Sequence, residues 1–143
     1  MTPKQFLKQS FKIVHQIEAK CARLEELRAM AERMTPILTG MPSGSGGSSK
    51  LEDAVIRIAD MEAEIAEEYN AATILLQDIT AAIKAVDQPD QRTLLELRYL
   101  AYRSWPEIAD ALYLSERQAY RLHGQALLNV RVPEQYQHGS KCQ

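Results

Sequence analysis

The stretch SWPEIADALYLSERQAYRLHGQALLN, residues 104–129, decides the fold of this 143-residue chain. It contains two places where a serine is followed three residues later by Glu or Gln: Ser104 with Glu107, and Ser115 with Gln118. Each pair fits a capping box, in which the serine hydroxyl and the later side chain satisfy backbone N–H groups at a helix start. Two such starts this close together predict a helix-turn-helix, with helices over residues 105–112 and 116–129.

Each of these helices carries one apolar face. Its residues recur at helical spacing: Ile108, Ala109 and Leu112 in the first helix, Ala119, Leu122 and Ala126 in the second. If the two faces pack together, the polar residues of the second helix point outward: Ser115, Glu116, Arg117, Gln118, Tyr120, Arg121 and Gln125. Such side chains read base edges and hold phosphates, so this set is the candidate DNA-binding site.

Within that site we expect a division of roles. The N-terminal residues of the second helix face base edges in a helix-turn-helix, so Arg117 and Gln118 are the predicted base readers, for guanine and adenine. Arg121 is placed for a phosphate or a flanking guanine. Ser115 is mainly the cap, and its backbone N–H is available to a phosphate.

The run LRYLAYRSWPEIADALYLSERQAYRLHGQAL, residues 97–127, resembles region four of bacterial primary sigma factors, which reads the promoter −35 element. Most of residues 1–131 resembles a phage-encoded family of sigma-region-four-like proteins related to ArpU-type late-transcription regulators. The segments that carry this wider resemblance are MPSGSGG, KLEDAVIRIADMEAEI and LLELRYL, together with SWPEIADAL and SERQAYRLH.

The resemblance implies a sequence-specific DNA-binding transcriptional regulator of phage or prophage type. It also implies that Glu116, Tyr120 and Gln125 line the surface that meets the promoter element. The chain departs from the family at Tyr102 and Tyr113, where a glycine is common. If the backbone there is left-handed, each Tyr costs about 1 kcal/mol or more.

Composition predicts an all-α fold, because helix formers dominate and no strand-like alternation occurs. A brace helix is expected over residues 91–102, capped by Asp90. Gly124 lowers the stability of its helix, and a close backbone approach would explain its presence. No apolar run approaches the roughly 20 residues of a membrane span, and the N-terminus lacks the apolar block of a signal peptide. We therefore expect a cytoplasmic protein.

Residues 1–88 are predicted to form a long antiparallel helical hairpin. Leu7, Val14 and Cys21 fall seven apart, with Ile17 and Leu24 on a second row. The second helix carries a longer series: Leu51, Ile58, Ile65, Ala72, Ile79 and Val86, flanked by Val55, Tyr69, Leu76 and Ile83. Thr35-Pro36 is expected to end the first helix, before a Gly/Ser-rich linker at residues 39–49. Residues 89–131 form the DNA-binding domain, and residues 132–143 a tail that is frayed or docked only locally.

The width of the apolar stripes predicts more than one helical neighbour. We expect hairpins from two chains to form a four-helix bundle; the competing interpretation is a monomer whose hairpin packs on its own DNA-binding domain. The formal charge is −2, but residues 1–34 carry +3, residues 50–88 carry −6 and residues 89–131 carry +1. So small a basic excess predicts poor DNA binding by one copy, and a second copy or RNA polymerase would supply the missing affinity.

No pattern indicates an enzyme or a cofactor. The chain has no nucleophile motif, Gly-rich phosphate loop or metal cluster. Cys21 is expected as a buried thiol, and the pair His138 and Cys142 has no second ligand pair beside it. His15 and His123 have no evident partners in the sequence. The rival to DNA binding is a protein-interaction module that binds RNA polymerase or another regulator through the acidic residues Asp60, Glu64, Glu67 and Glu68. Lys4, Lys8 and Lys12 lie one turn apart, on a solvated face or at a secondary phosphate contact.

Overall fold

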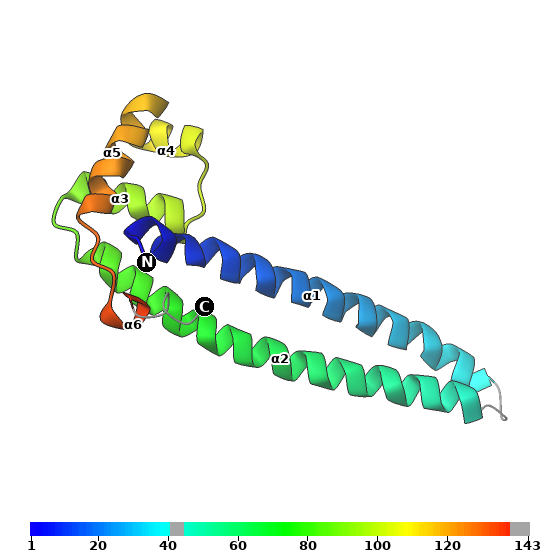
Figure 1. Cartoon of the computed structure of the whole chain (residues 1–143). Coiled ribbons are helices and arrows are strands. Elements are labelled where there is room, and N and C mark those ends of the chain that lie inside the picture. The colour runs from blue at the N-terminus through cyan, green and yellow to red at the C-terminus, as the bar shows by residue number, and fades with distance from the viewer. Residues whose placement is uncertain (41–44, 138–143) are drawn as a thin grey trace. The chain divides into compact units, whose positions relative to one another are not determined.

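The computed structural model describes the backbone of residues 1–40 and 45–137, and the side chains of residues 1–34 and 49–137. Every regular element in these ranges is a helix, as the composition predicted (Figure 1). In chain order they are α1 (Pro3–Gly40), α2 (Ser45–Lys84), α3 (Pro89–Leu95), the π-helical turn η1 (Glu96–Leu100), α4 (Trp105–Ala111), α5 (Glu116–Leu128) and α6 (Glu134–Gln137).

The chain divides into two compact units. The central unit is Val14–Ala71, and the terminal unit combines Met1–Ile13 with Ala72–Gln143. The division between the units lies inside both long helices. The first turns of α1 and the last turns of α2 therefore belong with the short C-terminal helices.

Two predicted interruptions of the long helices are wrong. The helix α1 continues past Pro36 to Gly40, and α2 already begins at Ser45. Proline removes its own backbone donor, and its ring crowds the carbonyl four residues earlier. A long helix can accommodate both effects by bending, so a proline need not end it. Of the linker expected at residues 39–49, the structure does not describe residues 41–44, and the remainder belongs to α1 and α2.

Ion pairs join α1 to α2 within the central unit. Lys20 Nζ pairs with Glu68 Oε1 and lies 4.0 Å from Glu64 Oε2, and Arg28 Nη2 lies 2.7 Å from Glu62 Oε1. The hydrogen bond to Glu68 is the main reason that the pKa of Lys20 is raised above its ordinary value. Later positions on α1 thus pair with earlier positions on α2.

Lys20 and Glu68 lie in the row of covered residues that runs along each helix. On α1 this row includes Ile17, Lys20, Leu24 and Leu27, and on α2 it includes Leu51, Ile58, Ile65 and Glu68. Cys21, which we expected to be buried, is exposed. The covered row passes through Ile17 and Leu24. Cys21 continues the seven-residue series of Leu7 and Val14, and at this position that series lies one residue away from the covered row.

One hydrophobic core holds the terminal unit together. It contains residues from six elements, from the turn after α2 and from the segment after α5: Phe6, Leu7, Ile79, Ile83, Val86, Leu94, Leu95, Tyr99, Ile108, Ala126 and Val130. Burial of these side chains, at about 25 cal/mol per Å² of apolar surface, is the main stabilising term of the unit. The core fixes α4 and α5 relative to the first turns of α1.

The brace helix begins earlier than we predicted, and its last turn is not α-helical. Gln88 is its N-cap, without a side-chain cap bond, and Pro89 occupies the first turn. The fixed φ of proline suits the first helical position, so Asp90 lies inside the helix rather than at the cap. In η1 the Ala101 N–H donates to Glu96 O at 2.9 Å, which widens the last turn.

The segment after α5 docks on distant residues, which corrects the expectation of a frayed or only locally docked tail. Tyr136 in α6 has its ring 4.9 Å from that of Phe6. Its hydroxyl donates to Asp78 Oδ2 at 2.6 Å. Burial, followed by this bond to a carboxylate, raises the pKa of Tyr136 to about 12.

No helix in the part of the chain that the structure describes is long and apolar enough to cross a membrane.

Candidate nucleic-acid interface

Both predicted capping boxes form. Glu107 N donates to Ser104 Oγ at 3.4 Å, and the Glu107 carboxylate accepts from Ser104 N at 3.2 Å. At the start of α5, Gln118 N donates to Ser115 Oγ at 3.1 Å. The Gln118 Oε1 accepts from Ser115 N at 2.9 Å. The helices α4 and α5 begin at the predicted residues, Trp105 and Glu116, and each ends one residue earlier than predicted.

The apolar face of α5 is committed to the core. Ala119 and Ala126 are fully buried, and Leu122 is half-buried on the same side. Ile108 and Ala109 of α4 are buried as predicted. This packing therefore fixes the rotation of α5 about its own axis, and so determines which of its side chains lie on the exposed face.

All seven predicted site residues are exposed on that remaining face: Ser115, Glu116, Arg117, Gln118, Tyr120, Arg121 and Gln125. Their side chains differ in how freely they can contact a ligand. The Gln118 amide oxygen is already held by the cap, so it would have to leave Ser115 N to accept from adenine. The predicted bidentate reading by Gln118 thus costs about one net hydrogen bond, roughly 1 kcal/mol.

Tyr120 is the site residue with an aromatic neighbour. Its ring centroid lies 4.6 Å from that of Trp105 at the start of α4. The Arg98 guanidinium lies over two rings, 4.9 Å from the centroid of Trp105 and 5.1 Å from that of Phe11. A series of contacts from Phe11 through Arg98 and Trp105 to Tyr120 thus leads from α1 to the exposed face of α5. Each of the two cation–π contacts contributes about 0.5 to 1 kcal/mol.

The turns that flank α4 are strained. Tyr102 and Tyr113 both have a φ of 57°, the left-handed region, and they are the non-glycine residues of the described chain with positive φ. After Tyr113 the Leu114 N–H donates to Ala109 O at 2.9 Å, which ends α4 and reverses the chain toward Ser115. Tyrosine in place of glycine at these two positions therefore strains the backbone, and both turns still form.

His123, to which we assigned no partner, has one. Its Nε2 lies 2.8 Å from the Tyr99 hydroxyl, and its ring packs 4.8 Å from that of Trp105. Burial, followed by the charges of Lys4, Arg98 and Lys8, lowers the pKa of His123 to about 4. Burial also raises the pKa of Tyr99 to about 12. Both groups are neutral at pH 7, and His123 braces α5 from behind the exposed face.

Two smaller predictions, on Gly124 and on His15, have outcomes. A Cβ added at Gly124 would meet nothing within 4 Å, so the close backbone approach suggested for this glycine is wrong. His15 also has a neighbour, since its Nδ1 lies 3.6 Å from Glu18 Oε2. Among the described residues no group of three His, Cys, Asp or Glu side chains could hold a metal. His138 and Cys142 lie outside those residues.

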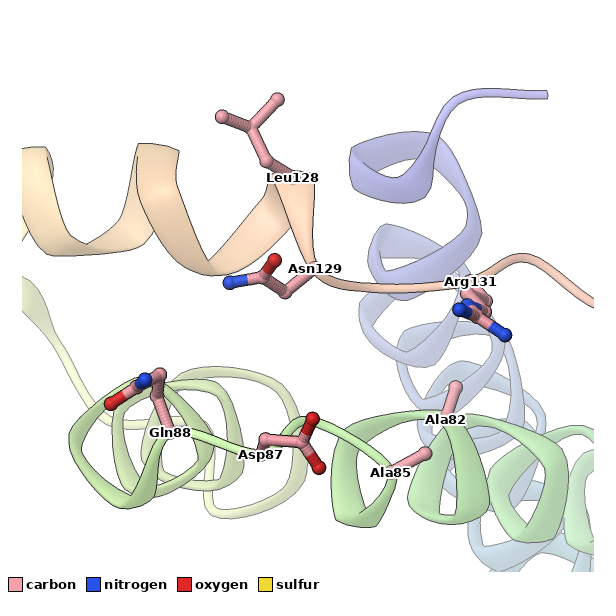
Figure 2. A pocket seen from close by; sticks show the side chains of 7 residues that line it. All are labelled: Ala82, Ala85, Asp87, Gln88, Leu128, Asn129 and Arg131. Carbon is pink, nitrogen blue, oxygen red and sulfur yellow. The ribbon is translucent and has the colours of Figure 1, made fainter.

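A pocket of about 550 Å³ lies at the C-terminal end of α5 (Figure 2). It is formed by the end of α2 with the turn that follows, and by the end of α5 with the segment beyond it. Its lining is Ala82, Ala85, Asp87, Gln88, Leu128, Asn129 and Arg131. The Asn129 amide donates to Gln91 Oε1 at 2.6 Å, so part of this polar lining serves to join α5 to α3.

Comparisons of the chain with protein-family models, with curated proteins and with solved structures gave no match.

Proposed function

We propose that this protein is a sequence-specific DNA-binding regulator of transcription that acts by contact and not by catalysis. The observation that carries the proposal is the division of α5 into a buried face and an exposed face. Ala119 and Ala126 hold one side in the core, while Arg117 and Arg121 stand exposed on the other. In this proposal α4 and α5 are a helix-turn-helix, and α5 enters the major groove.

Arg117 is the proposed base reader. It is the second residue of α5, where a recognition helix meets base edges, and its guanidinium forks onto guanine O6 and N7. Arg121 lies one turn further on and meets a phosphate or a flanking guanine. Gln118 contributes its amide N–H groups, which the cap leaves available, more readily than its oxygen.

The setting we propose is that of a phage or prophage regulator similar to sigma region four. The resemblance of residues 97–127 supports it, and so does the modest charge of the DNA-binding part. One copy of such a surface has few phosphate contacts, so a partner has to add affinity. RNA polymerase is one proposed partner, and a second copy of the chain is the other.

A second copy would associate through the long helices, which we propose to be an antiparallel hairpin. The apolar residues at the ends of these stripes, such as Phe6 and Val86, are already buried in the core of the terminal unit. Along α2, Val55, Ile56 and Tyr69 remain 53%, 58% and 63% exposed. Burial of these side chains between two chains would give the stripe its missing neighbour.

The rival function, protein interaction without DNA readout, loses part of its support. It rested on the acidic residues Asp60, Glu64, Glu67 and Glu68. Two of the four, Glu64 and Glu68, already pair with Lys20. This surface is therefore less available to an external basic partner than the sequence suggested.

The test begins with selection of bound duplexes from random DNA, followed by titration of the recovered sequence. We expect Arg117→Ala to weaken binding to the recovered duplex by about 1 to 3 kcal/mol, because one guanine contact is lost. Helicity should not change, since the side chain is exposed and has no part in the core. Arg131→Ala removes the same charge beyond α5 and should bind like the wild type. Equal binding by the Arg117→Ala variant and the wild type would contradict the proposal.

A further inference from the structure

Three lysines form an exposed basic edge on the first turns of α1. Lys4, Lys8 and Lys12 are spaced four residues apart, so they follow one another along one side of the helix. All three are exposed, and residues 1–13 contain no Asp or Glu. The edge is therefore uninterrupted by a carboxylate on its own helix.

Packing fixes this basic edge relative to α5. Phe6 and Leu7 are fully buried in the core of the terminal unit. The Phe11 ring, which lies between Lys8 and Lys12 in sequence, packs 5.6 Å from Tyr99 and 5.4 Å from Tyr102. These contacts come from the side of α1 that borders the lysines, so the basic edge adjoins the turn that leads into α4.

The field of this edge reaches α5. Lys4 and Lys8 are among the charges that hold the pKa of His123 low, together with Arg98. Arg98 itself lies over Trp105, whose ring contacts Tyr120 on the exposed face. The lysines and Arg98 therefore lie close enough to α5 to act electrostatically on its buried side.

The lysines also account for the charge of the terminal unit. Residues 72–143 contain eight Lys or Arg and eight Asp or Glu, so this part is formally neutral. The three lysines supply the whole formal excess of the unit that carries α5. Counted with them, the unit has a charge suited to a polyanion, which residues 89–131 alone do not show.

We propose that Lys4, Lys8 and Lys12 bind the phosphate backbone of the duplex that α5 reads, on the flank of the site. This inference rests on the proposed function, because it assumes the same duplex. An anionic membrane surface is the less suitable partner. Insertion of a basic amphipathic helix into a membrane surface needs exposed apolar residues beside its lysines, and here Phe6 and Leu7 are buried.

The experiment compares salt dependence in full-length variants, on the duplex recovered by selection. In the test variant Lys4, Lys8 and Lys12 are changed to Gln. The control variant, Arg23→Gln with Arg33→Gln and Lys50→Gln, loses the same three charges from exposed positions in the central unit. A third variant, with Lys→Arg at all three test positions, retains the charge.

We expect the test variant to reduce the slope of log affinity against log salt by about 2 to 3, since each phosphate contact contributes about 0.9. At about 0.1 M salt this corresponds to a loss on the order of a hundredfold. The control and the Lys→Arg variant should stay within about threefold of the wild type. Ethylation of the phosphates that flank the α5 site should weaken binding by the wild type, the control and the Lys→Arg variant. It should not weaken binding by the test variant.

Each outcome separates this inference from the proposed function. If the wild type binds specifically and the test variant matches the control, the phosphate role of the lysines is wrong and the proposed function stands. If duplex binding depends on the lysines but shows no sequence preference, the inference holds and base reading by α5 fails. If the wild type binds no duplex, both are overturned.

Discussion

The Tyr99 hydroxyl lies 2.8 Å from His123 Nε2 and joins η1 to the buried side of α5. This bond lies behind the face that we propose reads DNA. Because the pKa of His123 falls from 6.5 to about 4, the neutral imidazole is the form that the folded chain favours. The setting of α5 therefore depends on a residue that must not be protonated.

The first prediction concerns acid stability. A pKa that is lower in the folded state means that unfolding takes up a proton, so the contribution of His123 is fully present above pH 6.5. It is lost as the pH falls from 6.5 toward 4 and amounts to at most about 3 kcal/mol. Urea unfolding at a series of pH values, followed by circular dichroism, measures it.

The control for this prediction is His123→Gln, which keeps a polar side chain but does not titrate. We expect its free energy of unfolding to be lower at pH 7 and to change less between pH 6.5 and 4. Equal pH dependence in the variant and the wild type would show that other groups, not His123, control stability in this range.

The second prediction concerns the turn before α5. Tyr113 has a φ of 57° and is 95% exposed, so its ring contributes little packing while its backbone is strained. Tyr113→Gly should stabilise the fold by about 1 kcal/mol, because glycine adopts this conformation without a Cβ clash. Tyr113→Ala keeps the Cβ and should gain much less in thermal unfolding. A glycine variant no more stable than the alanine variant would contradict strain at this position.

The third prediction concerns the ion pair between α1 and α2. Lys20 and Glu68 lie in the covered row of the central unit, and Glu68 Oε2 is buried without a hydrogen-bond partner. Lys20→Met alone should lower the midpoint of thermal unfolding, since it leaves the carboxylate without its cation. The double variant Lys20→Met with Glu68→Leu should recover the loss or exceed the wild type. Additive losses in the double variant would rule out a coupled pair.

The sequence predicted the starts of α4 and α5 because capping is local. The serines and their partners lie three residues apart, so their bonds form whatever the rest of the chain does. The exposed face followed from the same helical period, since Ala119 and Ala126 mark its opposite side. These parts of the fold and of the candidate site needed no long-range information.

Other errors came from contacts between residues far apart in sequence. Cys21 is apolar enough for a buried row and Lys20 is not, yet Lys20 takes the covered position because Glu68 meets it from α2. Tyr99 and His123 are 24 residues apart, and no local pattern pairs them. The docking of Tyr136 on Phe6 likewise depends on the assembled core.

The most direct test of the central claim is selection from random duplex DNA, carried out in parallel with the wild type and with Arg117→Ala. The account predicts a defined binding sequence for the wild type. The Arg117→Ala variant should lose its preference at one base pair, worth about 1 to 3 kcal/mol, and keep the preferences elsewhere. No recovered sequence for the wild type, or the same sequence with equal affinity for the variant, would contradict the account.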